Sequence, residues 1–235
     1  MMSAADWRRD EAYEHLDTLD PSALAWEFLR RNPRYRAAYR AGDPVAPFGL
    51  RFPIDPDLSA AEAEPIWLTE VAPAIAVRMV AAAPSDVTSS GLAAAAARRR
   101  LADDGLHLRF PNGLQARVPL LADGRESLGA LVPLDRHLLR RLAAVRALRS
   151  GLAGRWRDLD LLSRARRRRL ARALRAGDAR SEGASYREIA ERVLGERFAD
   201  SLAWRTSSAR AVAIRLCAAA HELAGGGYLR LLAGR

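Results

Sequence analysis

Apolar residues in the first 42 positions recur at helical spacing in short runs separated by turn residues. The run from Asp10 to Leu16 predicts a short helix. Asp-Pro and Asn-Pro pairs at residues 20–21 and 32–33 predict two more, because the polar residue can cap a helix whose first position the proline occupies. Gly42 is expected to end the third helix. The aromatic residues gathered here favour a small core over a ligand site; they are Trp7, Tyr13, Trp26, Phe28, Tyr35 and Tyr39.

The next stretch, residues 43–84, contains seven prolines and is expected to be extended and irregular, with one strand over Ala74–Val80. Residues 88–102 fit either a helix or a mobile linker, since the alanine run in their middle has little to bury. Alternating apolar and polar residues then predict a small antiparallel sheet over residues 105–133. Asn112-Gly113 supplies its hairpin turn, and Asp123-Gly124 marks a second turn.

Helical spacing returns in the last hundred residues. Asp135 is expected to cap a helix that extends to about Leu152, with Leu138, Leu142, Val145 and Leu148 or Leu152 on one face. Three more helices follow. The first covers about residues 159–176, the second begins with the capping-box pair Ser185 and Glu188 and ends at Gly195, and the third follows Trp204. The third is expected to bury a stripe of Val212, Leu216, Ala219 and Leu223.

These elements predict a mainly α fold with a small antiparallel β element, an α+β chain of three regions. Residues 1–42 form an N-terminal helical module, and residues 43–135 form a proline-rich middle region with a hairpin. Residues 136–235 form a basic helical domain, with a helix-turn-helix variant at about residues 163–232.

The charge distribution separates the basic domain from the rest of the chain. Residues 1–135 carry 15 arginines and 19 acidic residues, a net charge of −4, whereas residues 136–235 carry 23 arginines and 9 acidic residues, a net charge of +14. The chain contains no lysine. Such an asymmetry indicates that one domain faces a polyanion, and the release of counterions favours binding of that surface to nucleic acid.

The string Tyr-Arg-Glu-Ile-Ala-Glu-Arg at 186–192 is typical of the supporting helix of a helix-turn-helix, with the small Ala190 where the second helix crosses. The connection from Leu194 to Arg205 is longer than the usual turn, so the motif is an extended variant. Six residues are predicted to contact DNA directly: Arg187, Arg205, Thr206, Ser207, Ser208 and Arg210. Arg215 and the Arg164–Arg169 cluster, in particular Arg164, Arg167 and Arg168, are predicted to contact phosphates.

Several residues in this region also fit structural roles. The Arg164–Arg169 run fits a solvated helix face as well as a phosphate-binding one. Tyr186 and Trp204 fit packing roles better than base stacking or intercalation. Gly225-Gly226-Gly227 fits a helix end better than a phosphate loop, because no Lys-Ser/Thr pair follows it.

Other classes of function find little support in the sequence. The four histidines are scattered and Cys217 is the only cysteine, so neither a metal site nor a disulfide is expected. Without a catalytic motif, we expect neither an enzyme nor a cofactor. There is no long apolar run and no signal-like segment, so the expected location is the cytoplasm.

Two stretches together resemble a known family. EHLDTLDPSALAWEFLRRNPRYRAAYR at 14–40 resembles the transcriptional-regulator-like domain of proteobacterial mobile elements. GASYREIAERVLG at 183–195, WRTSSARAVAIRL at 204–216 and GGYLRLL at 226–232 resemble the C-terminal DNA-binding domain of RovC-like and FseA-like activators. Members often carry charged residues where this chain has Ala209, Ala211 and Ala213.

The resemblance implies a transcriptional activator of an integrative and conjugative element or of type VI secretion genes. It also implies a homo-oligomer that binds double-stranded DNA, with RNA polymerase and a small antiactivator protein as further partners. One alternative stays open: the C-terminal helices could instead dock a partner protein, with the stripe of Val212, Leu216 and Leu223 receiving a helix of that partner.

Overall fold

The structure is a computed structural model that describes residues 6–82, 85–120 and 125–235. Its helices are α1 (Glu11–Glu14), α2 (Pro21–Leu29), α3 (Pro33–Ala41), α4 (Ala60–Ala63), α5 (Ser89–Ala95), α6 (Leu138–Leu152), α7 (Arg164–Ser181), α8 (Tyr186–Val193), α9 (Ser201–Thr206), α10 (Ser208–Glu222) and α11 (Leu229–Leu232). The strands are β1 (Ala76–Ala81), β2 (Arg98–Ala102), β3 (Gly105–Arg109), β4 (Gln115–Val118) and β5 (Leu128–Leu131). Short turns of helix lie at η1 (His15–Thr18), η2 (Ala46–Phe48) and η3 (Leu223–Gly227).

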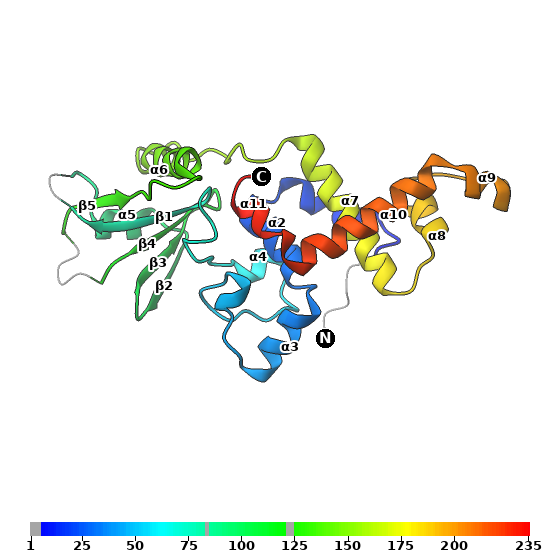
Figure 1. Ribbon diagram of the computed structural model, residues 1–235. Coiled ribbons are helices and arrows are strands. Elements are labelled where there is room, and N and C mark those ends of the chain that lie inside the picture. Colours follow the sequence, from blue (N-terminus) through cyan, green and yellow to red (C-terminus); the bar gives the residue numbers. More distant parts are fainter. Residues whose placement is uncertain (1–5, 83–84, 121–124) are drawn as a thin grey trace.

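The molecule is elongated in Figure 1. The sheet and α6 form one end, the N-terminal helices and α11 lie in the middle, and α8 and α9 form the other end. No helix among the described residues is long and apolar enough to cross a membrane. The mainly α composition with one small sheet is the predicted fold class.

The N-terminal helices begin and end where the sequence predicts. The Asp20 carboxylate accepts a hydrogen bond from the backbone N–H of Ala23 and caps α2. The Asn32 side chain accepts from the N–H groups of residues 34 and 35 and caps α3. Gly42 ends α3 with a φ of 74°, a left-handed conformation that a residue with a Cβ seldom adopts. These three helix ends are therefore fixed by local chemistry.

The sheet is mixed, whereas a purely antiparallel element was expected. Its strand order is β2-β3-β4-β1-β5. β3 and β4 form the predicted hairpin around Asn112-Gly113, but β4 pairs in parallel with β1, from Ala76 opposite Gln115. β1 precedes β4 in the chain, and a long connection joins them. Such a connection permits a parallel pair, which a tight turn does not. The predicted turn at Asp123-Gly124 lies outside the described residues.

Residues 88–102 divide between two kinds of structure: the expected helix forms only in the first part, and a strand follows it in place of more helix or a linker. Thr88 caps α5, which covers only Ser89–Ala95. Arg98–Ala102 then forms the edge strand β2, paired antiparallel with β3 from Arg98 opposite Arg109. The pairing partner lies farther along the chain, so the strand that follows the alanine run had no local signal.

The helix α6 packs against β1, and its buried face is rotated from the predicted one, with Leu148 common to both. Its buried residues are Ala144, Leu148 and Gly151, whereas Leu142 is 47% exposed and Leu139 is 80% exposed. Leu131 and Leu134, just before this helix, are also exposed. Gly151 faces the Trp156 ring, and several leucines point to solvent.

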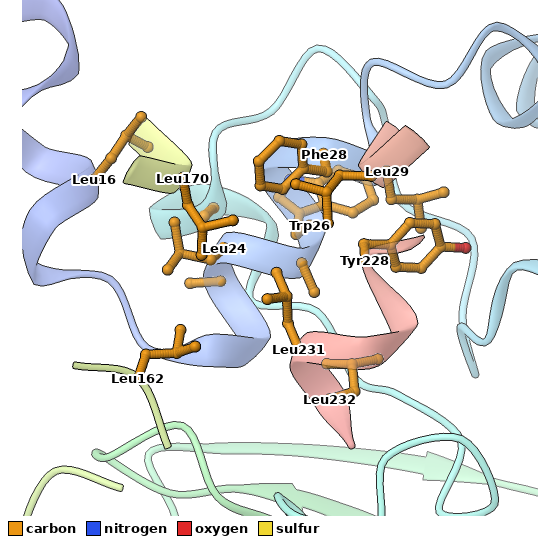
Figure 2. Packing of buried hydrophobic residues seen from close by; sticks show 14 of the residues in the cluster. Leu16, Leu24, Trp26, Phe28, Leu29, Leu162, Leu170, Tyr228, Leu231 and Leu232 are labelled. Atoms are coloured by element: carbon orange, nitrogen blue, oxygen red, sulfur yellow. The ribbon is translucent and has the colours of Figure 1, made fainter. Parts of the chain in front are cut away.

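The hydrophobic core joins the two ends of the sequence, as Figure 2 shows. Trp26, Phe28 and Leu29 of α2 are fully or nearly fully buried beside Tyr228, Leu231 and Leu232 from the C-terminal segment. The Tyr228 hydroxyl donates to the Phe48 carbonyl at 2.8 Å, and burial raises the pKa of that hydroxyl. The Asn32 side chain donates to the Ala224 carbonyl at 2.8 Å. The N-terminal helices are thus completed by residues from the end of the basic region.

Candidate nucleic-acid interface

Three helices of the basic region, α7, α8 and α10, pack against one another. The side chain of Ser185 accepts from the N–H of Glu188, and the Glu188 carboxylate accepts from the N–H of Ser185 at 2.7 Å, so the predicted capping box is present. That backbone hydrogen bond holds the pKa of Glu188 below its usual range. Ile189 and Ala190 are fully buried, which places the apolar side of α8 in the interior.

The crossing of α7 and α10 is close because small residues line it. A Cβ on Gly177 would lie 2.7 Å from the Cβ of Ala220, closer than two carbon atoms can approach. One turn earlier on α10, the Cys217 thiol lies 3.6 Å from the Ala176 carbonyl oxygen. The backbones of the two helices are therefore held together over this part of α10.

The buried stripe of α10 consists of Ala209, Ala213, Leu216, Cys217 and Ala220. It is rotated from the predicted stripe, because Val212 and Ala219 are only half-buried. Two of the three alanines that depart from the family pattern, Ala209 and Ala213, thus serve packing; only Ala211 is exposed.

The long connection between α8 and α10 is structured. It contains α9, which is capped by the Asp200 carboxylate and was not predicted. Phe198 and Trp204 pack edge to face, with ring centroids 5.1 Å apart. The Arg187 guanidinium donates to the Phe198 carbonyl at 3.2 Å and to Glu191 at 2.9 Å. Trp204 thus has the packing role that the sequence favoured, and the connection is held against α8.

The predicted DNA-contacting residues divide into free and engaged side chains. Arg205, Ser208, Arg210 and Arg215 are exposed and lie on α9 or α10. Thr206 donates to the Leu202 carbonyl within α9, and the Ser207 hydroxyl accepts from the N–H of Ala209 as the cap of α10. Arg187 is held by Glu191 and Phe198, as described above. Arg205 to Arg210 are brought together at the start of α10, whereas Arg215 lies further along that helix.

On the outer side of α10, Ser208, Ala211 and Arg215 follow one another at spacings of three and four residues, opposite the buried stripe. Arg210 is exposed near the start of the helix, on a different side from these three residues. Two exposed arginines that the sequence analysis did not single out, Arg192 on α8 and Arg197 in the connection, belong to the same end of the molecule. The position of Arg192 could have been inferred, because it falls opposite the apolar side of α8.

The arginines at the start of α7 have different surroundings. Arg164 and Arg169 are exposed and make no ion pair with the described residues. Arg168 lies 3.6 Å from Asp17, and Arg166 donates to the Arg235 carbonyl. Arg167 is half-buried, and its Nε has no hydrogen-bond partner in the described chain. Of Arg164, Arg167 and Arg168, which were predicted to contact phosphate, only Arg164 is both exposed and without an ion pair to the described residues.

Residues of the N-terminal module bind the second half of α7 and the residue that ends it. The Arg31 guanidinium donates to both oxygens of Asp178, and the Tyr13 hydroxyl donates to the same carboxylate at 2.7 Å. The Trp7 indole donates to Glu182 at 2.8 Å. The Arg175 side chain is buried and donates to the Trp7 carbonyl at 2.6 Å. The helix that carries the arginine cluster is therefore bound to the N-terminal module along its length.

Tyr186 and the glycines at 225–227 have surroundings that fit packing and helix-ending roles. Tyr186 is half-buried with the Arg180 guanidinium 5.0 Å from its ring centre. The glycines at 225–227 form the bend between α10 and α11, where Gly226 has a φ of 133°. Among the described residues, no three histidine, cysteine or acidic side chains are grouped as metal ligands. Leu216 and Leu223 are each only 7% exposed, so the stripe that was considered for a partner helix is occupied within the chain.

Comparison with known families matches two segments of the chain. Residues 6–51 match the proteobacterial transcriptional regulator-like domain. Residues 131–233 match the RovC-type DNA-binding domain of a type VI secretion transcription factor. No curated protein sequence matches the chain.

The second match begins in β5 and includes α6 to α11, so it contains every residue predicted to contact DNA. The first contains α1, α2 and α3, and two of its residues, Tyr13 and Arg31, bind Asp178 of α7. The chain is therefore a DNA-binding transcriptional regulator that joins a proteobacterial regulator-like domain to a DNA-binding domain of the RovC type.

Proposed function

We propose that this regulator is a sequence-specific transcriptional activator that inserts α10 into the major groove of DNA. In this proposal α7, α8 and α10 form a helix-turn-helix variant, and α9 lies in its extended turn. The observation that carries it is the outer side of α10. Ser208 and Ala211 are small and exposed there, and Arg215 follows them. Small side chains allow the helix backbone to approach the base edges, and the major groove is wide enough to admit a helix.

The surrounding arginines can make the base and phosphate contacts that such docking needs. Arg205 and Arg210 flank the start of α10 and make no ion pair with the described residues. An arginine can donate two parallel hydrogen bonds to guanine, which is the commonest specific base contact. Arg164, at the start of α7, would contact the phosphate backbone. Arg187 would act indirectly, because its hydrogen bonds hold the connection that carries Phe198.

The genes that it activates are proposed from the family. The description of the matching domain names type VI secretion, and the resemblance of residues 14–40 points to mobile elements. We propose secretion genes, or the conjugation and excision genes of an integrative element, as targets. RNA polymerase and a small antiactivator protein are the proposed partners. The protein would act in the cytoplasm, without a cofactor and without enzymatic activity.

Self-association is proposed to use the leucines near α6. Leu134 and Leu139 are 89% and 80% exposed, and Leu131 and Leu142 are 44% and 47% exposed. These leucines lie close together in the sequence, and exposed large apolar side chains favour protein contact over solvent. A second copy of the chain is the proposed occupant. In light scattering, Leu139→Ser/Leu142→Ser should give a smaller mass than the unchanged protein. If the unchanged protein is an oligomer and the double variant has the same mass, this surface is not the interface.

DNA recognition is tested with duplexes selected from a random pool by the full-length chain. In a mobility-shift assay, Arg205→Ala/Arg210→Ala should weaken binding to the selected duplex by roughly 1–3 kcal/mol for each base-reading arginine removed, and reduce its preference over unrelated DNA. Arg34→Ala/Arg99→Ala removes the same charge from exposed positions on α3 and β2 and is the matched control. If both double variants bind the selected duplex as the unchanged protein does, α10 is not the reading helix.

A further inference from the structure

A cavity of about 540 Å³ lies between α6 and the segment that joins α6 to α7. One wall is the side of α6 that carries Arg140, Ala143 and Arg146, and the opposite wall is formed by residues 155–161. Its volume is within the range of small-molecule sites. In Figure 1, α6 lies beside the sheet, at the end of the molecule opposite α8 and α9. The cavity is therefore separate from the proposed DNA-reading surface.

Four arginines line this cavity, and their side chains form no ion pair or hydrogen bond with the described residues: Arg140, Arg146, Arg155 and Arg157. The two other arginines of α6 that point elsewhere are both paired. Arg141 lies 3.0 Å from Asp135, and Arg149 lies 2.8 Å from Asp86. On this helix, the arginines that line the cavity are thus the ones without a carboxylate partner. An anion with several oxygen atoms would satisfy them.

The rest of the lining combines apolar surface with carboxylates, which suits an anion that also has an uncharged part with amino groups. Ala74, Ala144 and Leu159 supply apolar surface, and each is at least nine-tenths buried. Asp158 and Asp160 also line the cavity, and their carboxylates can accept hydrogen bonds from amino groups. Guanidinium groups for phosphates, apolar walls for a ring, and carboxylates for its amino groups together suit a nucleotide.

The cavity wall is held in place without a ligand. Trp156 stacks on Phe110 with ring centroids 4.9 Å apart, and a Cβ on Gly151 would collide with the Trp156 ring. The Asn112 side chain donates to the Arg157 carbonyl at 2.9 Å. The segment before α7 is therefore anchored to the hairpin of the sheet, and a preformed site costs little ordering when its ligand binds.

Duplex DNA fits this site poorly. A duplex presents a convex surface with a continuous row of phosphates, whereas the site is a concave space of about 540 Å³. Asp158 and Asp160 would repel part of such a row. A small phosphorylated molecule can place its phosphates by the arginines and its ring away from them.

We propose that the cavity between α6 and residues 155–161 binds a purine nucleotide, with Arg146 and Arg157 on its phosphates. This goes beyond the proposed DNA recognition and does not depend on it. GTP and ATP are the probes, titrated into the full chain by calorimetry, with guanosine and inorganic triphosphate as partial ligands. One nucleotide should bind per chain, more tightly than either partial ligand.

Arg146→Ala/Arg157→Ala should weaken nucleotide binding by roughly tenfold or more for each charge-assisted hydrogen bond that is removed. Arg149→Ala is the matched control on the same helix and should bind as the unchanged chain does. Ala147→Trp should block the cavity and abolish binding. Because Arg146 and Arg157 are exposed, their replacement should leave thermal unfolding unchanged.

Three results would overturn the proposal: no binding of either nucleotide, equal weakening in Arg149→Ala, or triphosphate binding as tightly as the nucleotide. A fourth would assign the cavity to DNA, namely a selected duplex whose affinity falls in Arg146→Ala/Arg157→Ala and which displaces the nucleotide. DNA recognition by α10 is judged separately from Arg205→Ala/Arg210→Ala, so either proposal can fail alone.

Discussion

Arg31 and Asp178 form a paired hydrogen bond between the two ends of the chain, with N–O distances of 2.6 and 2.8 Å across 147 residues of sequence. The carboxylate also accepts from Tyr13. Both charged side chains are largely shielded from water, at 22% and 18% exposure. Burial by itself lowers the pKa of Arg31, but its hydrogen bonds to Asp178 and the charge of Glu27 outweigh burial and raise that pKa. This ion pair fixes the N-terminal module to α7, the helix that precedes α8 and α10.

Asp178→Ala is therefore expected to lower the free energy of unfolding by about 3 kcal/mol, the lower end for breaking a buried pair, because it leaves the Arg31 guanidinium without this partner. Chemical denaturation measures the change. Asp158→Ala, an exposed position without an ion pair among the described residues, is the control. In a double-mutant cycle with Arg31→Ala, purely additive effects would show that the two side chains do not interact.

Gly177→Val is expected to destabilise the protein through the crossing of α7 and α10. The new Cβ would meet Ala220 at 2.7 Å, and overpacking of this kind costs about 1–3 kcal/mol. Gly225→Val is the matched control, since a Cβ there meets nothing within 4 Å. Thermal unfolding of the two variants should differ clearly. Equal midpoints would mean that the helices can separate at this crossing without a cost in stability.

Acid is expected to weaken the N-terminal module through Glu27. Burial by itself raises the pKa of this carboxyl, but Arg31 and Arg30 outweigh burial, and the pKa lies below its ordinary value of 4.5. A group with a lowered folded pKa stabilises above its unfolded pKa, and that stability is lost as the pH falls through the folded value. The free energy of unfolding should therefore fall below about pH 4.5.

Denaturation between about pH 3 and pH 7 tests this dependence. Glu27→Gln should be less stable at neutral pH and should lose less stability on acidification. Glu14→Gln, at an exposed position of α1, should follow the unchanged protein. An acid response of Glu27→Gln as steep as that of the unchanged chain would remove Glu27 from the explanation.

The salt dependence of DNA binding should separate phosphate contacts from base contacts. Arg164→Ala is expected to lower the slope of log affinity against log salt concentration by about one, with little change in sequence preference. Arg34→Ala should leave the slope unchanged, since α3 lies away from α9, which precedes the start of α10, in Figure 1. Titration at several salt concentrations measures both. An unchanged slope in Arg164→Ala would place the start of α7 off the DNA.

The sequence predicted the features that depend on neighbouring residues and missed those that depend on residues far away in the chain. Asp20, Asn32 and Ser185 mark helix ends because each side chain bonds to backbone groups two or three residues away. The edge strand β2 could not be found that way, since its alanine-rich surroundings favour a helix and its partner β3 decides otherwise. Likewise, the pairing of Arg31 with Asp178 leaves no local signal.

The candidate interface was predicted unevenly for the same reason. The basic half and the capping box of α8 follow from composition and spacing. The orientation of α10 does not, because leucine and valine positions suggested one stripe and the alanines that allow close packing at Gly177 define another. Helix α9 was missed because its six residues carry no apolar pattern of their own, and Asp200 alone marks its start.

The position of Tyr228 also sets an order of events during synthesis. Its hydroxyl binds the Phe48 carbonyl, 180 residues earlier in the chain, and its ring lies against the core of the N-terminal helices. While the ribosome is still making the basic half, those helices lack part of the surface that buries Trp26 and Leu29. Nascent chains stopped before Tyr228 should therefore expose apolar surface and depend on chaperones until the final helix arrives.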